Sequence, residues 1–197
     1  MSIEIELKAW VDDPDGLRAR LFSFAGLETS FEKADSYWFI TGTGSSVPLS
    51  GVRIRRETKT DPDGRVSHAL WVTYKVKEIR EGIEINDERE FSVSDDTAFE
   101  ELLRRLGLEK GIEKNKRGWA WICEGITTEL TEVEGLGWFV ELEIITDNDT
   151  NEAVTAARFR LLELLHKIGI KKDRIEPRYY TEMLREKAKP GPFPYLD

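Results

Sequence analysis

Like charges recur two residues apart in segments of this sequence that otherwise show the alternating apolar pattern of β-strands. In Ile3–Trp10, the residues Glu4, Glu6 and Lys8 alternate with isoleucine and leucine. Because residues two apart in a strand point to the same face, one face of this segment is apolar and the other is charged. Glu129 stands alone in its strand, but the same spacing recurs in the pairs Arg53/Arg55, Lys75/Lys77, Glu88/Glu90, Lys114/Lys116 and Glu141/Glu143.

These charged faces contain acids and bases in equal number, and each set needs a neutralising partner. Removing a charge from water costs several kcal/mol unless a partner compensates. Hard divalent cations such as Mg²⁺ or Mn²⁺ prefer carboxylate oxygens, whereas arginine and lysine bind phosphate. A metal-bound triphosphate satisfies both sets. The predicted metal ligands are Glu4, Glu6, Glu88, Glu90, Glu129, Glu141 and Glu143, and the predicted triphosphate-binding residues are Lys8, Arg53, Arg55, Lys75, Lys77, Lys114 and Lys116.

The alternative interpretation is that these charges form the solvated outer face of an ordinary antiparallel sheet. Their recurrence in most of the predicted strands, with both signs, favours instead a shared enclosed surface. The helices and the opposite strand faces supply enough apolar residues to form a core outside that enclosure.

The chain reads as short strands connected by hairpin-like links, with a few helices between them. Strands are predicted at Ile3–Trp10, Asp35–Ile40, Val52–Glu57, Ala69–Lys77, Ile83–Val93, Gly111–Lys116, Gly118–Cys123, Ile126–Thr131 and Trp138–Thr146, and helices at Asp12–Ala25, Ser94–Leu106, Thr150–Ile168 and Pro177–Lys187. This order predicts an α+β fold with a mostly antiparallel sheet that could close into a barrel. We expect one domain over residues 1–189 and an irregular, proline-rich tail over 190–197.

Composition narrows the function classes. A net charge of −9 argues against a broad nucleic-acid-binding surface, which needs a basic face. No apolar run approaches the roughly 18 residues that span a bilayer, and the acidic exterior argues against a membrane-surface role. The single Cys123 lies in an apolar run and is predicted to be a core residue. The absence of an internal disulfide and of a secretory signal predicts a cytoplasmic protein.

The pattern Glu4-x-Glu6-x-Lys8 resembles the signature of the CYTH proteins, which include class IV adenylyl cyclases and thiamine triphosphatases. Further matching segments follow in the family's order over nearly the whole chain: Asp35-Ser36-Tyr37, Arg53-Ile54-Arg55, Tyr74-Lys75, Glu88/Glu90, Lys114/Lys116 and Glu141/Glu143. Val133–Glu141 and Tyr180–Leu184 are similar to the cyclase-type branch, while Phe39, Lys116 and Thr131 differ from residues frequent in the family. The resemblance implies a triphosphate tunnel, which is an eight-stranded antiparallel closed barrel with helices outside and a triphosphate and divalent metal in its lumen.

Three activities are compatible with this reading. A class IV adenylyl cyclase would convert ATP to cyclic AMP and pyrophosphate. A hydrolase would release phosphate from inorganic, thiamine or nucleoside triphosphate, and Tyr37 and Lys75 match a tyrosine–lysine pair of the hydrolytic relatives. Tyr37 lies beside two other aromatic residues, so plain aromatic packing is an equal alternative for it. The third reading is a non-catalytic protein that binds polyphosphate or nucleotide. No sequence feature decides between a monomer and a homodimer.

Overall fold

The structure is a computed structural model that describes residues 3–25, 27–40, 51–80, 83–148 and 150–188. For residues 24, 75–78, 80, 87 and 88 it describes the backbone alone. Within these ranges the chain forms eight strands, four α-helices and one 3-10 helix. The strands are β1 (Ile3–Trp10), β2 (Thr29–Ile40), β3 (Val52–Thr60), β4 (Val66–Arg80), β5 (Ile83–Ser92), β6 (Leu108–Cys123), β7 (Ile126–Val133) and β8 (Gly137–Thr146). The helices are α1 (Pro14–Ala25), α2 (Asp96–Arg105), α3 (Asn151–Lys167), η1 (Lys172–Arg174) and α4 (Tyr180–Lys187).

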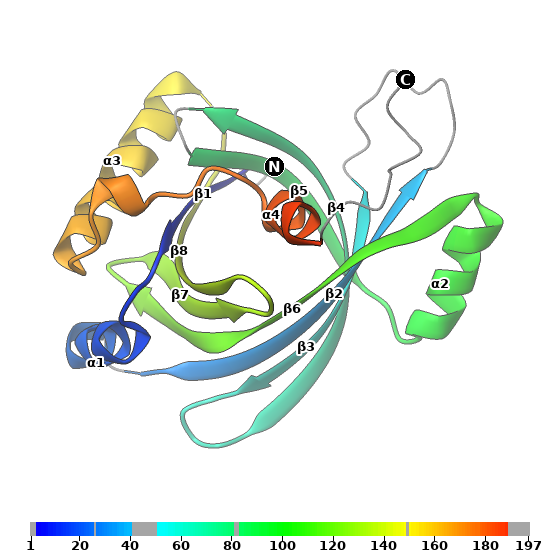
Figure 1. The fold of residues 1–197 in the computed structure, drawn as a ribbon, viewed down its shortest axis with the longest axis horizontal. Coiled ribbons are helices and arrows are strands. Elements are labelled where there is room, and N and C mark those ends of the chain that lie inside the picture. Colours follow the sequence, from blue (N-terminus) through cyan, green and yellow to red (C-terminus); the bar gives the residue numbers. More distant parts are fainter. Residues whose placement is uncertain (1–2, 26, 41–50, 81–82, 149, 189–197) are drawn as a thin grey trace.

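All strand pairs are antiparallel, and the sheet is strongly curled (Figure 1). The strand β1 pairs with β8 along its whole length and with β5 over Ile3–Glu6. The order of hydrogen-bonded neighbours is therefore β1-β5-β4-β3-β2-β6-β7-β8, and it returns to β1. The predicted α+β class with an antiparallel sheet is confirmed.

Most strand bounds differ from the sequence prediction by a few residues, and two assignments differ more. The segments predicted at Gly111–Lys116 and Gly118–Cys123 form one continuous strand, β6. Gly118 lies within this strand and does not break it. A Cβ atom at this position would lie 2.0 Å from the backbone oxygen of Leu130, so glycine is needed here for the close approach of β7. The strand β2 begins at Thr29 rather than at Asp35, since its first residues are too polar to give an apolar strand signal.

The apolar core lies on the outer face of the curled sheet. Ile5 of β1 and Leu142 of β8 pack in one cluster with Leu17 of α1 and Leu161 of α3, and Cys123 is buried in the same cluster. A second cluster under α2 contains Trp38, Ile54, Val72 and Leu103. Figure 1 shows α1 and α3 at one side of the sheet and α2 at the other. The strand faces opposite to this core are left for charged residues.

The helix α4 occupies a different position from the other three. In Figure 1 it lies within the outline of the curled sheet. Tyr180 and Met183 of α4 are buried against Val133 of β7 and Phe139 of β8. The helix therefore places side chains next to the inner face. It begins at Tyr180 rather than at the predicted Pro177.

In the described ranges, we find no helix with the length and apolar character needed to cross a membrane.

The core position of Leu161 gives a direct test of this packing. Leu161 is fully buried, whereas Phe159 on the same helix is 63% exposed. We expect Leu161→Ala to lower the free energy of unfolding by about 2–5 kcal/mol, because it leaves a cavity under α3. The matched control Phe159→Ala should change it by no more than about 0.5 kcal/mol. Denaturant unfolding followed by far-UV circular dichroism measures both, and equal losses would contradict the packing of α3.

Candidate active site

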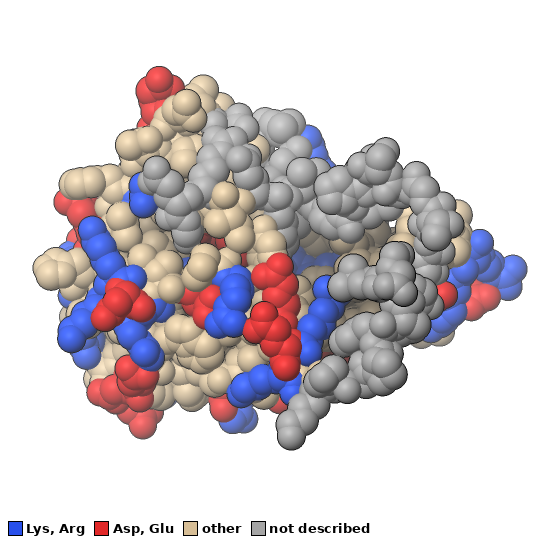
Figure 2. Space-filling model, turned by 45° about the horizontal axis from the view of Figure 1, so that its top comes forward, with Lys and Arg blue, Asp and Glu red and all other residues tan. Residues whose placement is uncertain are grey.

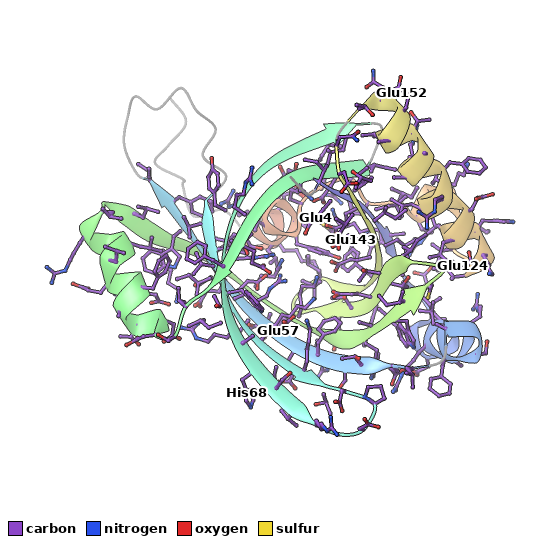
Figure 3. All side chains as sticks on the ribbon, turned by 180° about the vertical axis from the view of Figure 1, so that it is seen from behind. Glu4, Glu57, His68, Glu124, Glu143 and Glu152 are labelled. Atoms are coloured by element: carbon purple, nitrogen blue, oxygen red, sulfur yellow. The ribbon has the colours of Figure 1, made fainter. Side chains whose placement is uncertain are left out.

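The inner face of the curled sheet surrounds a cavity of about 1180 Å³. Strand alternation brings charged residues from strands that are distant in the sequence onto this one surface. Most of the residues predicted from the sequence line it: Glu4, Glu6, Tyr37, Arg53, Arg55, Glu90, Lys114, Lys116, Glu129, Glu141 and Glu143. Figure 3 shows Glu4 and Glu143 close together in the interior, whereas Glu124 and Glu152 lie at the periphery. The convergence of these residues is a finding, but their roles as ligands stay predictions.

The remaining predicted residues are placed differently. The side chains of Lys75, Lys77 and Glu88 lie outside the described part of the structure, although their backbones pair in β4 and β5. Lys8 is buried rather than part of the cavity lining, and its Nζ atom lies 2.5 Å from Glu84 Oε1. Lys8 Nζ also lies 5.3 Å from the ring centroid of Tyr180.

The first ionic cluster is centred on Asp35, whose side chain is completely buried. Arg55 donates from Nε to Asp35 Oδ1 at 2.7 Å and from Nη2 to Oδ2 at 2.9 Å. Lys114 Nζ lies 3.1 Å from Oδ2. Burial opposes ionisation of the carboxyl, but the charges of Arg55 and Lys114 outweigh it and hold the pKa of Asp35 well below its usual range. Asp35 is therefore an ionised carboxylate between two cations.

The second cluster joins two lysines to two glutamates. Lys33 donates to both carboxylate oxygens of Glu129, at 2.6 and 2.8 Å. Lys116 donates to Glu141 Oε2 at 2.7 Å, and the Tyr180 hydroxyl donates to Glu141 Oε1 at 2.9 Å. Glu141 thus receives one charged and one neutral hydrogen bond.

Burial and pairing shift the pKa values within this second cluster in definite directions. Burial disfavours the charged form of Glu141, but Lys116 outweighs it and lowers its pKa to about 2. Burial, opposed by Glu129, lowers the pKa of Lys33. The pKa of Tyr180 is raised well above its usual value by burial and by the neighbouring Glu141. The carboxylate of Glu141 is therefore charged at neutral pH, and Tyr180 keeps its proton.

A third group lies where β3, β4 and β5 meet. Arg53 Nη2 donates to the Thr73 hydroxyl at 2.8 Å, and that hydroxyl donates to Glu90 Oε2 at 3.0 Å. Arg53 Nη2 lies 3.5 Å from the same carboxylate oxygen. Thr73 thus links Arg53, a predicted triphosphate-binding residue, to Glu90, a predicted metal ligand.

Further residues of this inner surface were not predicted as site residues. Glu57, for example, lines the cavity with its Oε1 atom 3.9 Å from Lys33 Nζ. Alternation along the strands could have found four charged ones, because they continue the charged faces: Lys33, Asp35, Glu57 and Glu84. Tyr180 had no such signal, since it comes from a helix that is distant in the sequence. Its ring centroid lies 5.3 Å from Lys114 Nζ and 5.5 Å from Lys116 Nζ, which is within the range of a cation–π contact.

The structure offers a partial fit for a divalent cation. The strand register places Glu6 opposite Glu143 on β8 and opposite Glu84 on β5. Among the residues whose side chains are described, no group of three or more acidic, histidine or cysteine residues is arranged to hold a metal. Magnesium commonly uses only one or two carboxylates and takes its other ligands from water and substrate phosphates. Glu6 and Glu143 therefore fit a cation that arrives with a phosphate ligand.

The surface outside the cavity carries both signs of charge. Figure 2 shows lysine and arginine residues beside aspartate and glutamate residues over the described part of the visible face. Ion pairs also form on the outer strand faces, such as that of Arg117 with Glu132 at 2.6 Å.

Residues 2–180 match the model of the CYTH domain, and the chain therefore belongs to the CYTH family. Members of this family act on triphosphates and generally depend on divalent metal. The chain is 27% identical over 184 residues to "Putative adenylate cyclase MJ0240" of Methanocaldococcus jannaschii. The aligned region covers 92% of this chain and 98% of that protein.

Two solved structures illustrate the likeness of the fold. Protein PH1819 of Pyrococcus horikoshii OT3 is 27% identical, with a TM-score of 0.76 and coverage of 93% of this chain and 99% of that one. HpAC1 of Hippeastrum, an adenylyl cyclase candidate described as having a dominant triphosphatase activity, is 19% identical, with a TM-score of 0.61 and coverage of 94% and 96%.

The low pKa of Glu141 predicts a pH dependence of stability. Its folded-state value of about 2 is below its ordinary value of 4.5, so its pairing stabilises the fold above about pH 4.5 and is lost as the pH falls toward about 2. We expect Glu141→Gln to be less stable than the wild type at pH 7 and the difference to shrink toward pH 2.

Denaturant unfolding at a series of pH values measures this difference. The control Glu132→Gln removes an ion pair on the outer face and should lower the free energy of unfolding by no more than about 1 kcal/mol at pH 7. A difference between Glu141→Gln and the wild type that does not change with pH would contradict the ionic role of Glu141.

Proposed function

We propose that this protein is a metal-dependent enzyme that acts on a nucleoside triphosphate in the cavity, converting ATP to cyclic AMP and pyrophosphate. In this proposal the curled sheet works as a closed triphosphate tunnel. The observation that carries it is the convergence of cations and carboxylates on one inner surface. A polyanion and a divalent cation together are the ligands that such a surface accommodates best.

The size of the cavity supports a nucleotide rather than inorganic triphosphate. Its volume of about 1180 Å³ exceeds the roughly 300–1,000 Å³ typical of pockets for drug-sized ligands. There is space for a nucleoside beside the phosphates. The name of the Methanocaldococcus jannaschii relative, which matches over nearly its full length, supports the cyclase reading.

In the proposed reaction the ribose 3′-oxygen bonds to the α-phosphorus and gives up its proton to water. The bond from that phosphorus to the bridging oxygen breaks, and pyrophosphate leaves with the bonding electron pair. Arg55, Lys114 and Lys116 would stabilise the negative charge that develops on the phosphate oxygens. Glu6 and Glu143 would hold Mg²⁺ or Mn²⁺, with Glu4 and Glu141 beside them. When bound, such an ion supplies charge neutralisation and orients the phosphates.

A second candidate function is hydrolysis of the terminal phosphate. The specific observation that favours it is the position of Tyr37, which lines the cavity with its ring centroid 5.5 Å from Lys114 Nζ. A hydroxyl among phosphate-binding cations could assist proton transfer to or from the reacting groups. The Hippeastrum protein, which is alike in fold, is described with a dominant triphosphatase activity.

Product analysis tests the proposed activity. The protein is incubated separately with ATP, inorganic triphosphate and thiamine triphosphate, with Mg²⁺ and then with Mn²⁺, and the products are separated by chromatography. We expect cyclic AMP and pyrophosphate from ATP. Orthophosphate would support the hydrolase instead, and triphosphate binding without turnover would support a binding protein.

Glu6→Gln tests the metal site. Loss of a direct ligand should lower metal-dependent turnover by more than about 100-fold, beyond the 10–100-fold typical of outer-shell partners. The control Glu152→Gln changes an exposed glutamate of α3 and should leave turnover unchanged. Steady-state rates across a range of Mg²⁺ concentrations measure both. Wild-type turnover in Glu6→Gln would remove Glu6 from the metal site.

A further inference from the structure

We propose that Asp35 is a positioning residue that orients Arg55 and Lys114 toward the triphosphate without touching the substrate itself. The inference rests on the proposed function and adds a residue to its site. The geometry around Asp35, its burial and its difference from the other inner carboxylates support it.

The contact between Asp35 and Arg55 fixes the direction of the guanidinium. Two parallel hydrogen bonds, at 2.7 and 2.9 Å, join one edge of the guanidinium to both carboxylate oxygens. Paired bonds of this kind restrain orientation as well as distance. Arginine has five N–H donors, so three remain after these two bonds. Asp35 thereby determines which donors Arg55 can turn toward the cavity.

Asp35 holds Lys114 at the same time. Lys114 Nζ lies 3.1 Å from Asp35 Oδ2, and an ammonium group has three donors. The strand register supports this arrangement, because Asp35 of β2 lies opposite Arg55 of β3 and opposite Lys114 of β6. One carboxylate between two strands thus sets the spacing of two cations that both line the cavity.

The inner carboxylates Glu129 and Glu141 differ from Asp35 in their access to the cavity. Their side chains are 17% and 12% exposed and line the cavity, whereas the side chain of Asp35 is 0% exposed and does not. A metal ion or phosphate can therefore reach the two glutamates but not Asp35. Its effect on the reaction must pass through the cavity-lining groups that it contacts, which are Arg55, Lys114 and the Tyr37 hydroxyl, 3.5 Å from Asp35 Oδ2.

The charge of Asp35 also sets the local balance. Arg55 and Lys114 contribute two positive charges, and Asp35 offsets one of them. An amide in its place would retain one acceptor oxygen but would turn an N–H₂ group toward a cation. The paired contact with Arg55 would be lost, while the net positive charge facing a polyanion would rise.

These two consequences separate ground-state binding from turnover. In Asp35→Asn the extra positive charge should keep the dissociation constant of inorganic triphosphate equal to or below that of the wild type. Displacement of Arg55 and Lys114 should lower kcat for ATP by about 10- to 100-fold, because small displacements of groups around the reacting atoms slow a reaction strongly. Calorimetric titration with inorganic triphosphate should still give one site per chain, so the loss would not reflect a smaller folded fraction.

Asp35→Glu is the second variant and keeps the test decisive if the asparagine variant does not fold. It restores the negative charge but displaces it by one methylene group. Positioning predicts that kcat stays low, whereas a role through charge alone predicts full recovery. The control Glu132→Gln alters an ion pair on the outer face and should match the wild type in both measurements.

The outcomes separate this inference from the proposed function. A wild-type kcat in Asp35→Asn or Asp35→Glu at full binding stoichiometry would overturn the positioning role and leave the proposed function standing. A fall in stoichiometry that parallels the fall in kcat would also overturn it, because the role would then be structural. A wild-type protein that neither binds inorganic triphosphate nor turns over any triphosphate would overturn the proposed function, and this inference with it.

Discussion

The neutralisation of buried charge on the inner face of the sheet is the constraint on which this structure depends. Lys33, Arg55 and Lys116 each form a close ion pair with a carboxylate from another strand. Since an unpaired ion out of water costs several kcal/mol, these contacts require the strands to keep their register. The curled sheet and its ionic interior are therefore mutually dependent.

This pairing also shapes what the cavity can bind. A triphosphate must compete with the carboxylates for the same cations, and a divalent ion must compete with the cations for the same carboxylates. When both ligands bind, neither half of a broken ion pair is left uncompensated. The phosphate neutralises the cation of the pair, and the metal ion neutralises its carboxylate. Glu141, whose pKa of about 2 reflects its pairing with Lys116, lies at such an exchange point. Under the proposed function, a cavity built in this way would favour a metal-bound polyphosphate over either component alone.

Much of the fold and of the site could be predicted from local patterns. Alternation identified Arg53 and Arg55, and Glu141 and Glu143, as pairs on one strand face, and the structure places all four on the cavity lining. Lys33 was missed because the polar beginning of β2 has no apolar repeat to mark it as a strand, and Asp35, the first residue of the predicted strand, received no role because its two cation partners lie on other strands. The continuous β6 was divided at Gly118, because glycine in a strand ordinarily indicates a break. Glycine is needed at position 118 because β7 approaches β6 closely there, and a local sequence pattern does not show that approach.

The sequence by itself determined which residues share a face, since a strand has a period of two whatever its neighbours are. It thereby determined the antiparallel α+β class and the ionic character of one surface. Only the tertiary structure decided which carboxylate meets which cation, because those partners come from strands far apart in the chain. Tyr180 shows this most clearly. A helix near the end of the described chain brings its hydroxyl to Glu141 and its ring to Lys114, and no local spacing encodes a contact that depends on how the helix packs within the sheet.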